Sequence, residues 1–144
     1  MRKAKRVIGY VCDIPVPDTD LVISKDDQRF RIMKYAKNED LEIIHIYEDE
    51  EYTDDFINRP GVQKILNSRD DLEILLVERV WCLSRRMNEL MPFLKKLERN
   101  NIQIVTSSYL WDDVSQGVRH YNLVARLRRE RKKQADTDAI RDVA

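Results

Sequence analysis

The sequence is poor in glycine and cysteine, and it contains no long apolar run. Only three of its 144 residues are glycine, and no G-x-G-x-x-G or Walker pattern occurs, which excludes the loops that hold nucleotide phosphates. Its cysteines, Cys12 and Cys82, lie far apart without C-x-x-C spacing, so neither a zinc site nor a disulfide framework is indicated. The apolar run Ile74–Val77 has four residues, whereas a membrane-spanning helix needs roughly 20. A chain of this length is therefore expected to fold around a single core.

Targeting and metal-binding signals are scarce as well. The basic start of the chain, residues 1–6, is not followed by the apolar stretch of a signal peptide, so we expect a cytoplasmic protein. The histidines, His45 and His120, have no further metal ligand at a useful spacing. We therefore expect no metal and no cofactor.

Charge is balanced overall but segregated along the chain. The 26 basic and 26 acidic residues give a formal net charge of zero. Residues 126–133 carry six bases and one acid, whereas residues 48–55 carry six acids and no base. The basic segment can contact phosphate groups, which the acidic segment repels.

Apolar periodicity predicts alternating strands and helices. Short apolar runs predict strands over 6–12, 41–47, 72–77 and 102–105. Helical spacing predicts helices over 24–38, 83–97 and 117–134, with another that opens at 59–61. This alternation predicts an α/β fold of three layers, with a mostly parallel sheet of four or five strands and a long C-terminal helix.

We expect three parts along the chain. Residues 1–116 are assigned to the α/β domain, 117–134 to the terminal helix with its basic end, and 135–144 to a frayed tail. Pro15 and Pro17 predict an irregular loop after the first strand, because prolines disrupt regular pairing. A ligand site is expected beyond the carboxyl ends of the strands.

Several short strings occur in a fixed order along this pattern. They are Gly9-Tyr10 in the first strand, Gln28 in the first helix, Arg59-Pro60-Gly61 with Gln63, Leu83-Ser84-Arg85, and Gly117 before the last helix. Over about residues 6–133, this order resembles the catalytic domain of serine recombinases, the resolvase and invertase family. The resemblance implies a domain that cuts and rejoins DNA through a serine, holds the phosphate with arginines and uses no metal.

The first strand departs from the family's pattern at two positions. The family's strand ends Gly-Tyr-x-Arg-x-Ser, whereas here Cys12 stands at the arginine and Ile14 at the serine nucleophile. A neutral thiol offers one weak donor where a guanidinium offers five in a fixed fork. An enzyme without its nucleophile is expected to be inactive.

The segment after the third strand departs as well. The family has Leu-Asp-Arg-Leu-x-Arg, whereas Trp81 stands here at the acid and Cys82 at the first arginine. Arg85 keeps the last arginine, and Gln28 and Arg59 keep two further positions of the phosphate site. Trp81 is interpreted as filling the vacated pocket, with stacking on a base as the alternative. The two cysteines are interpreted as buried and inert, with a redox pair or soft-metal site as the alternative.

Ser24 offers another alignment, because Ser24 and Gln28 also resemble the family's Ser-x-x-x-Gln. This alignment needs a longer loop after Tyr10 and a shorter first helix, and it places Val22 at the arginine. We interpret Ser24 as the helix cap and keep the nucleophile as the alternative.

The terminal helix carries the remaining candidate residues. Its apolar face is expected to support self-association, and its basic end to bind duplex DNA. The predicted function is that of a catalytically inactive, recombinase-like protein. It is expected to serve as a regulatory or oligomerisation module that associates with DNA or with an active recombinase. The alternatives are a protein-interaction module without DNA binding and an active recombinase that uses Ser24. The apolar set is Val118, Tyr121, Val124, Ala125 and Leu127, and the basic set is Arg126, Arg128, Arg129, Arg131, Lys132 and Lys133.

Overall fold

The computed structural model describes residues 4–68 and 71–143, the last four as backbone only. Four parallel strands of this part of the chain form one sheet in the order β4-β1-β5-β6. The α/β class and the parallel sheet are thus confirmed. The strands are β1 (Lys5–Cys12), β4 (Leu41–Asp49), β5 (Ile74–Val77) and β6 (Gln103–Thr106).

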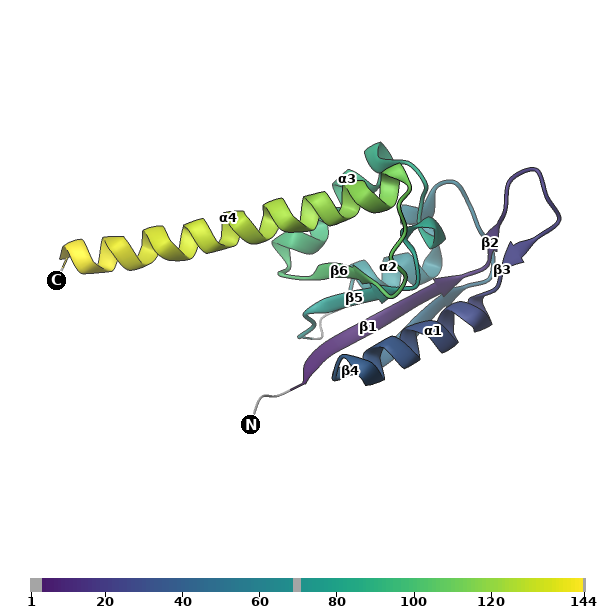
Figure 1. Cartoon of the computed structure of the whole chain (residues 1–144), viewed down its shortest axis with the longest axis horizontal. Coiled ribbons are helices and arrows are strands. Elements are labelled where there is room, and N and C mark those ends of the chain that lie inside the picture. The colour runs from purple at the N-terminus through teal and green to yellow at the C-terminus, as the bar shows by residue number, and fades with distance from the viewer. Residues whose placement is uncertain (1–3, 69–70, 144) are drawn as a thin grey trace.

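Helices cover both faces of the sheet, which gives the three layers. Helix α1 (Lys25–Asn38) lies on one face, and α2 (Pro60–Leu66) and α3 (Met87–Arg99) lie on the other (Figure 1). A short 3-10 turn, η1 (Phe56–Asn58), precedes α2. The helix predicted over 24–38 is confirmed, because Ser24 is its N-cap.

The central strand β1 supplies side chains to both layers. Val7 and Val11 pack with Ile32 of α1, whereas Ile8 and Tyr10 belong to the larger core cluster under α2 and α3. Successive side chains of a strand point to opposite faces, so the near-continuous apolar run of β1 is what a strand covered on both sides requires.

A small antiparallel hairpin follows β1, where an unpaired loop was predicted. Strand β2 (Ile14–Pro15) pairs with β3 (Val22–Ile23), with Ile14 opposite Ile23. The prediction was wrong because proline is tolerated in edge strands, where its missing N–H is not needed. The hairpin therefore lengthens the connection between β1 and α1.

Helix α3 begins later than predicted, at Met87 instead of Leu83. A 3-10 turn, η2 (Val80–Cys82), precedes it. The backbone carbonyls of Cys82 and Leu83 accept hydrogen bonds from the Arg59 side chain. Because Arg59 binds these carbonyls, this segment does not continue as an α-helix.

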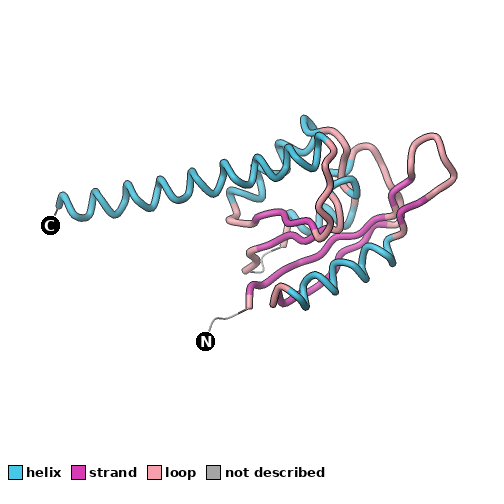
Figure 2. The backbone as a smooth tube through the Cα atoms, viewed as in Figure 1, coloured by secondary structure: helices cyan, strands magenta, loops and turns pink. Residues whose placement is uncertain are grey.

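Helix α4 (Asp113–Val143) is longer than predicted at both ends and projects from the body of the domain (Figure 2). It begins before Gly117 because the Asp112 carboxylate accepts from the backbone N–H of Ser115, as an N-cap does. The tail predicted to fray is helical over 135–143, since no glycine or proline interrupts it, and residue 144 lies outside the described residues. None of the described helices has an apolar stretch that could span a lipid bilayer.

Candidate functional site

Arg59 lies at the centre of the candidate site, and its guanidinium is fully engaged by the protein. The side chain is 2% exposed. Its Nη1 donates to the Cys82 carbonyl at 2.5 Å and to the Tyr10 hydroxyl at 3.2 Å. Its Nη2 donates to the carbonyls of Thr53 at 2.6 Å and Leu83 at 3.3 Å, and its Nε donates to Thr53 Oγ1 at 3.3 Å. All five guanidinium N–H groups therefore have partners, and none is left for a bound phosphate.

Tyr10 links Arg59 to a buried acid. The Tyr10 hydroxyl donates to Asp49 Oδ2 at 2.7 Å, and Asp49 Oδ1 accepts from the backbone N–H of Gly61 at 2.7 Å. A Cβ at Gly61 would lie 2.7 Å from Asp49 Oδ2, so only glycine allows the carboxylate to approach the start of α2 this closely. Asp49 and Tyr10 were not predicted as site residues, because their partners are remote in sequence.

Cys12 and Cys82 are both free, buried thiols. Burial raises the pKa of both side chains, so they are neutral at physiological pH. Both thiols belong to the same core cluster. The described residues contain no group of three potential metal-ligating side chains of His, Cys, Asp or Glu.

Gln28 and Ile14 complete the buried floor of the site. Gln28 Nε2 donates to the carbonyls of Cys12 at 2.7 Å and Ile23 at 3.0 Å, and its Oε1 accepts from the Cys12 N–H at 3.3 Å. It thereby ties the end of β1 to the hairpin and to α1. Ile14 is fully buried in the core cluster. Both side chains are occupied in holding the fold.

Trp81 is half-buried between two arginines. Its ring lies 4.1 Å from the Arg85 guanidinium carbon and 5.2 Å from that of Arg79, and its Nε1 donates to Asp112 at 3.0 Å. Arg85 lines a cleft of about 350 Å³ with Pro15 and other residues. Its Nη2 is buried and has no hydrogen-bond partner within the described chain. Of the three positions that the resemblance assigns to a phosphate site, Gln28, Arg59 and Arg85, only Arg85 thus has an unused donor among the described residues.

Ser24 is exposed and acts as the N-cap of α1, with its Oγ accepting from the Asp27 N–H at 3.1 Å. The neighbouring N–H of Lys25 donates to Asp13 at 2.6 Å. Acidic residues crowd this end of the sheet, where Glu48 and Glu50 both approach Lys25 Nζ. The surroundings of Ser24 are therefore unfavourable for an anionic phosphodiester.

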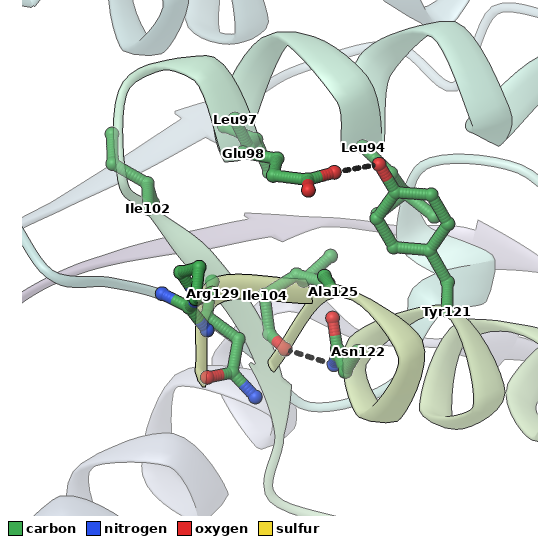
Figure 3. Close-up of a pocket in the computed structure, with 10 residues that line it drawn as sticks. Leu94, Leu97, Glu98, Ile102, Ile104, Tyr121, Asn122, Ala125 and Arg129 are labelled. Carbon is green, nitrogen blue, oxygen red and sulfur yellow. Dashed lines mark hydrogen bonds between the residues drawn. The ribbon is translucent and has the colours of Figure 1, made fainter. Parts of the chain in front are cut away.

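The start of α4 is anchored to α3 and to the edge strand β6 (Figure 3). Asn122 Nδ2 donates to the carbonyl of Ile104 at 2.8 Å, and the Tyr121 hydroxyl donates to Glu98. Arg128 also pairs with Glu98, at 3.2 Å. These contacts hold only the first half of α4, so the second half projects from the domain (Figure 1). The side chains of residues 129–139 are exposed.

The predicted self-association residues do not form one exposed face. Val118 and Ala125 are buried against the domain's own core, which corrects their assignment to a partner surface. Tyr121 and Val124 are partly buried, and Leu127 is exposed, together with Leu123, which was not predicted. The anchored face was mistaken for a free one because periodicity identifies an apolar face but not what covers it. All six predicted DNA-binding bases of α4 are exposed.

Comparisons with known proteins relate the chain to resolvase-type recombinase domains. The family model described as the resolvase N-terminal domain matches residues 18–140. The matched range contains Ser24 and Gln28 but neither Cys12 nor Ile14. No curated protein is significantly similar in sequence to the chain.

Solved structures share the fold at low sequence identity. The N-terminal catalytic domain of TP901-1 integrase is 20% identical, with a TM-score of 0.67 over 92% of this chain and 99% of that chain. A resolvase family site-specific recombinase from Streptococcus pneumoniae is 16% identical, with a TM-score of 0.60 over 96% and 98% of the two chains. The C-terminal catalytic domain of ISC1926 TnpA, an IS607-like serine recombinase, is 13% identical, with a TM-score of 0.58 over 83% and 79%.

Proposed function

The chain belongs to the family of resolvase N-terminal domains, and from that membership we propose a recombinase-related module that no longer cleaves DNA. In this proposal it self-associates and acts in a regulatory role on DNA or on an active recombinase. The observation that carries the proposal is the guanidinium of Arg59, whose five donors all bind protein acceptors. Phosphoryl transfer depends on such donors, and the loss of one costs roughly 10²–10³ in rate in other enzymes.

The proposed loss of cleavage holds in either alignment of the first strand. If Ile14 takes the nucleophile's position, a buried hydrocarbon side chain stands where the family has the serine hydroxyl. If Ser24 takes it, as the matched range favours, Val22 stands at the arginine two residues earlier. Cys82 stands at a second arginine in both alignments, so at least two guanidiniums of the family's phosphate site are absent.

The direct experiment is incubation of the purified chain with supercoiled plasmid DNA. We expect no nicked, linear or recombined product at any protein concentration. Ser24→Ala should behave in the same way. Products that appear with the wild-type chain and disappear with Ser24→Ala would contradict the proposed loss of cleavage.

DNA association is proposed for the projecting half of α4. Its six exposed bases can neutralise several phosphates, and each neutralised phosphate adds about −0.9 to the slope of log K against log salt concentration on duplex DNA. Arg128 contributes less because it already pairs with Glu98. A mobility-shift assay at several salt concentrations should give a steep slope that flattens when the six bases are replaced by alanine. An unchanged slope would refute this role.

A protein-interaction module without DNA binding is the second candidate. It is favoured by the exposed apolar side chains of Leu123 and Leu127 on α4, which no described residue covers. In this case the wild-type chain would self-associate or bind a protein without shifting DNA at any salt concentration. The mobility-shift assay therefore separates the two candidates.

A further inference from the structure

A groove of about 420 Å³ lies beside α1, away from the Arg59 site. Its α1 wall carries Phe30, Arg31, Lys34 and Tyr35, and Ser107 and Ser108 close it at the end of β6. The ladder between β5 and β6 continues into these serines, because the Ser107 N–H donates to the Val77 carbonyl at 2.9 Å. The groove therefore lies at the carboxyl edge of the parallel sheet, where α/β folds bind ligands.

The wall of the groove presents an aromatic ring to solvent. Phe30 is 66% exposed, and no ring contact to another aromatic side chain is present for it among the described residues. Tyr35, which is partly buried in the core cluster under α1, lies on the same groove. An exposed ring beside a hollow offers a face on which a planar ligand can stack.

The charge of the groove favours one negative group. Its acid, Asp27, is already paired with Arg31 at 3.0 Å. Lys34 has no carboxylate partner in the part of the chain that the structure describes. One uncompensated ammonium remains, and it can pair with the phosphate group of a nucleotide.

A hydroxyl in the same groove has no hydrogen-bond partner. Ser107 Oγ is buried and unpaired among the described residues, whereas Ser108 Oγ donates to the buried Glu78. An unsatisfied buried hydroxyl costs free energy, and a ligand oxygen or ring nitrogen could satisfy it. Ser107 therefore supplies a polar contact in addition to the ring and the ammonium.

We propose that this groove binds a nucleotide unit, with its base stacked on Phe30, its phosphate at Lys34 and a polar atom at Ser107. The unit is either a free mononucleotide or one unpaired nucleotide of a DNA strand. The proposal does not depend on whether the chain cleaves DNA or on the basic half of α4. Base stacking on aromatic side chains is tolerant of sequence, so no particular base is required.

The test uses the full chain and three probes, which are thymidine monophosphate, a short oligothymidylate and a duplex of equal length. Amide chemical shifts should change over residues 30–38 and at Ser107 and Ser108 with the monophosphate, with the oligothymidylate or with both. A response to the monophosphate identifies a free-nucleotide site, and a response to the oligothymidylate alone identifies a strand site. Shifts confined to α4, or no shift with either probe, would overturn the proposal.

Exposed variants then identify the contacts without disturbing the core. Phe30→Ala should weaken binding of the responding probe about five-fold or more, as loss of one stacked base does. Met33→Ala is the matched control, because Met33 is also exposed on α1 but does not line the groove. Lys34→Ala is compared with Lys37→Ala in the same way. Equal effects of the groove variants and their controls would contradict the site.

Discussion

The hydroxyl of Tyr10 lies between two buried charged side chains. It donates to Asp49 at 2.7 Å and accepts from Arg59 at 3.2 Å, so this neutral hydroxyl bridges the acid and the base. Buried ions are tolerated when every lone pair and proton has a partner, and removal of one partner leaves a charge uncompensated. At the scale of the residue, the candidate site is therefore organised as a stabilising network.

The first prediction concerns this hydroxyl. Tyr10→Phe should lower the free energy of unfolding by about 1–3 kcal/mol, because Asp49 and Arg59 each lose a buried partner. Urea denaturation provides the measurement. Tyr35→Phe is the control, because the Tyr35 hydroxyl has no hydrogen-bond partner among the described residues. A similar loss in both variants would contradict the network.

The second prediction concerns the thiols. Burial raises the pKa of Cys12 and Cys82, and the thiolate is the reactive form. In the native protein both cysteines should react with a disulfide reagent at least about a hundred-fold more slowly than in denaturant. The check is a time course at pH 8 with and without urea. A thiol that reacts rapidly in the native state would show that the core around Cys12 and Cys82 is accessible to the reagent.

Part of this site could be predicted from the sequence. The departures from the family's pattern at Trp81 and Cys82 are visible in the sequence because the resemblance places them between a strand and a helix, whereas those at Cys12 and Ile14 depend on which alignment of the first strand is used. The engagement of Arg59 was not visible, because its acceptors are mostly backbone carbonyls, and a sequence does not show which carbonyls turn toward a side chain.

At the scale of the element, α4 depends on its cap. Asp112 accepts from the Ser115 N–H at 3.1 Å and from Trp81 Nε1 at 3.0 Å. It thereby connects the start of α4 to the turn η2, which contains Trp81. The helix bounds were mispredicted because Gly117 was interpreted as a boundary, whereas it lies within the helix, facing Met87.

The third prediction is a pH-dependent effect at this cap. Burial alone would raise the pKa of Asp112, but hydrogen bonds from Ser115 and Trp81 outweigh it and lower the pKa below its usual value. A lowered folded-state pKa means that the stabilisation is present above the unfolded pKa of about 3.9 and is lost as pH falls through the folded value.

Asp112→Ala should therefore cost about 1 kcal/mol at pH 7, as the loss of an N-cap does. This difference should shrink below about pH 4, because the carboxylate is protonated first in the unfolded chain and at lower pH in the folded one. Thermal unfolding of both proteins across this range is the measurement. A difference that is constant from pH 7 to pH 3 would exclude a contribution from the charge.

At the scale of the whole molecule, the acidic segment 48–55 and the basic segment 126–133 lie apart. The acids of segment 48–55 lie at the carboxyl end of β4 and just beyond it, whereas the bases of α4 lie on the helix that projects away (Figure 1). The alternation of strands and helices was enough to predict the sheet, because each element had a clear period. The hairpin and the projecting tail were missed, because short strands and solvated helices carry no apolar period of their own.

The fourth prediction concerns self-association. Leu123→Asp combined with Leu127→Asp should weaken self-association about ten-fold or more, because both exposed side chains would lie in a partner interface. Analytical ultracentrifugation over a range of concentrations measures the change. Met33→Asp, which also replaces an exposed apolar side chain but on α1, should have no effect. Equal dissociation constants for the wild-type chain and the double variant would show that Leu123 and Leu127 do not lie in the interface.

The central proposal, that the chain no longer cleaves DNA and that the donors of Arg59 are engaged by the protein itself, is tested most directly by mass spectrometry. The chain is incubated with a suicide DNA substrate, from which a recombinase cannot release its covalent intermediate. We predict that the intact mass of the protein stays unchanged. A covalent DNA adduct on a serine, present in the wild-type chain and absent in Ser24→Ala, would contradict the claim.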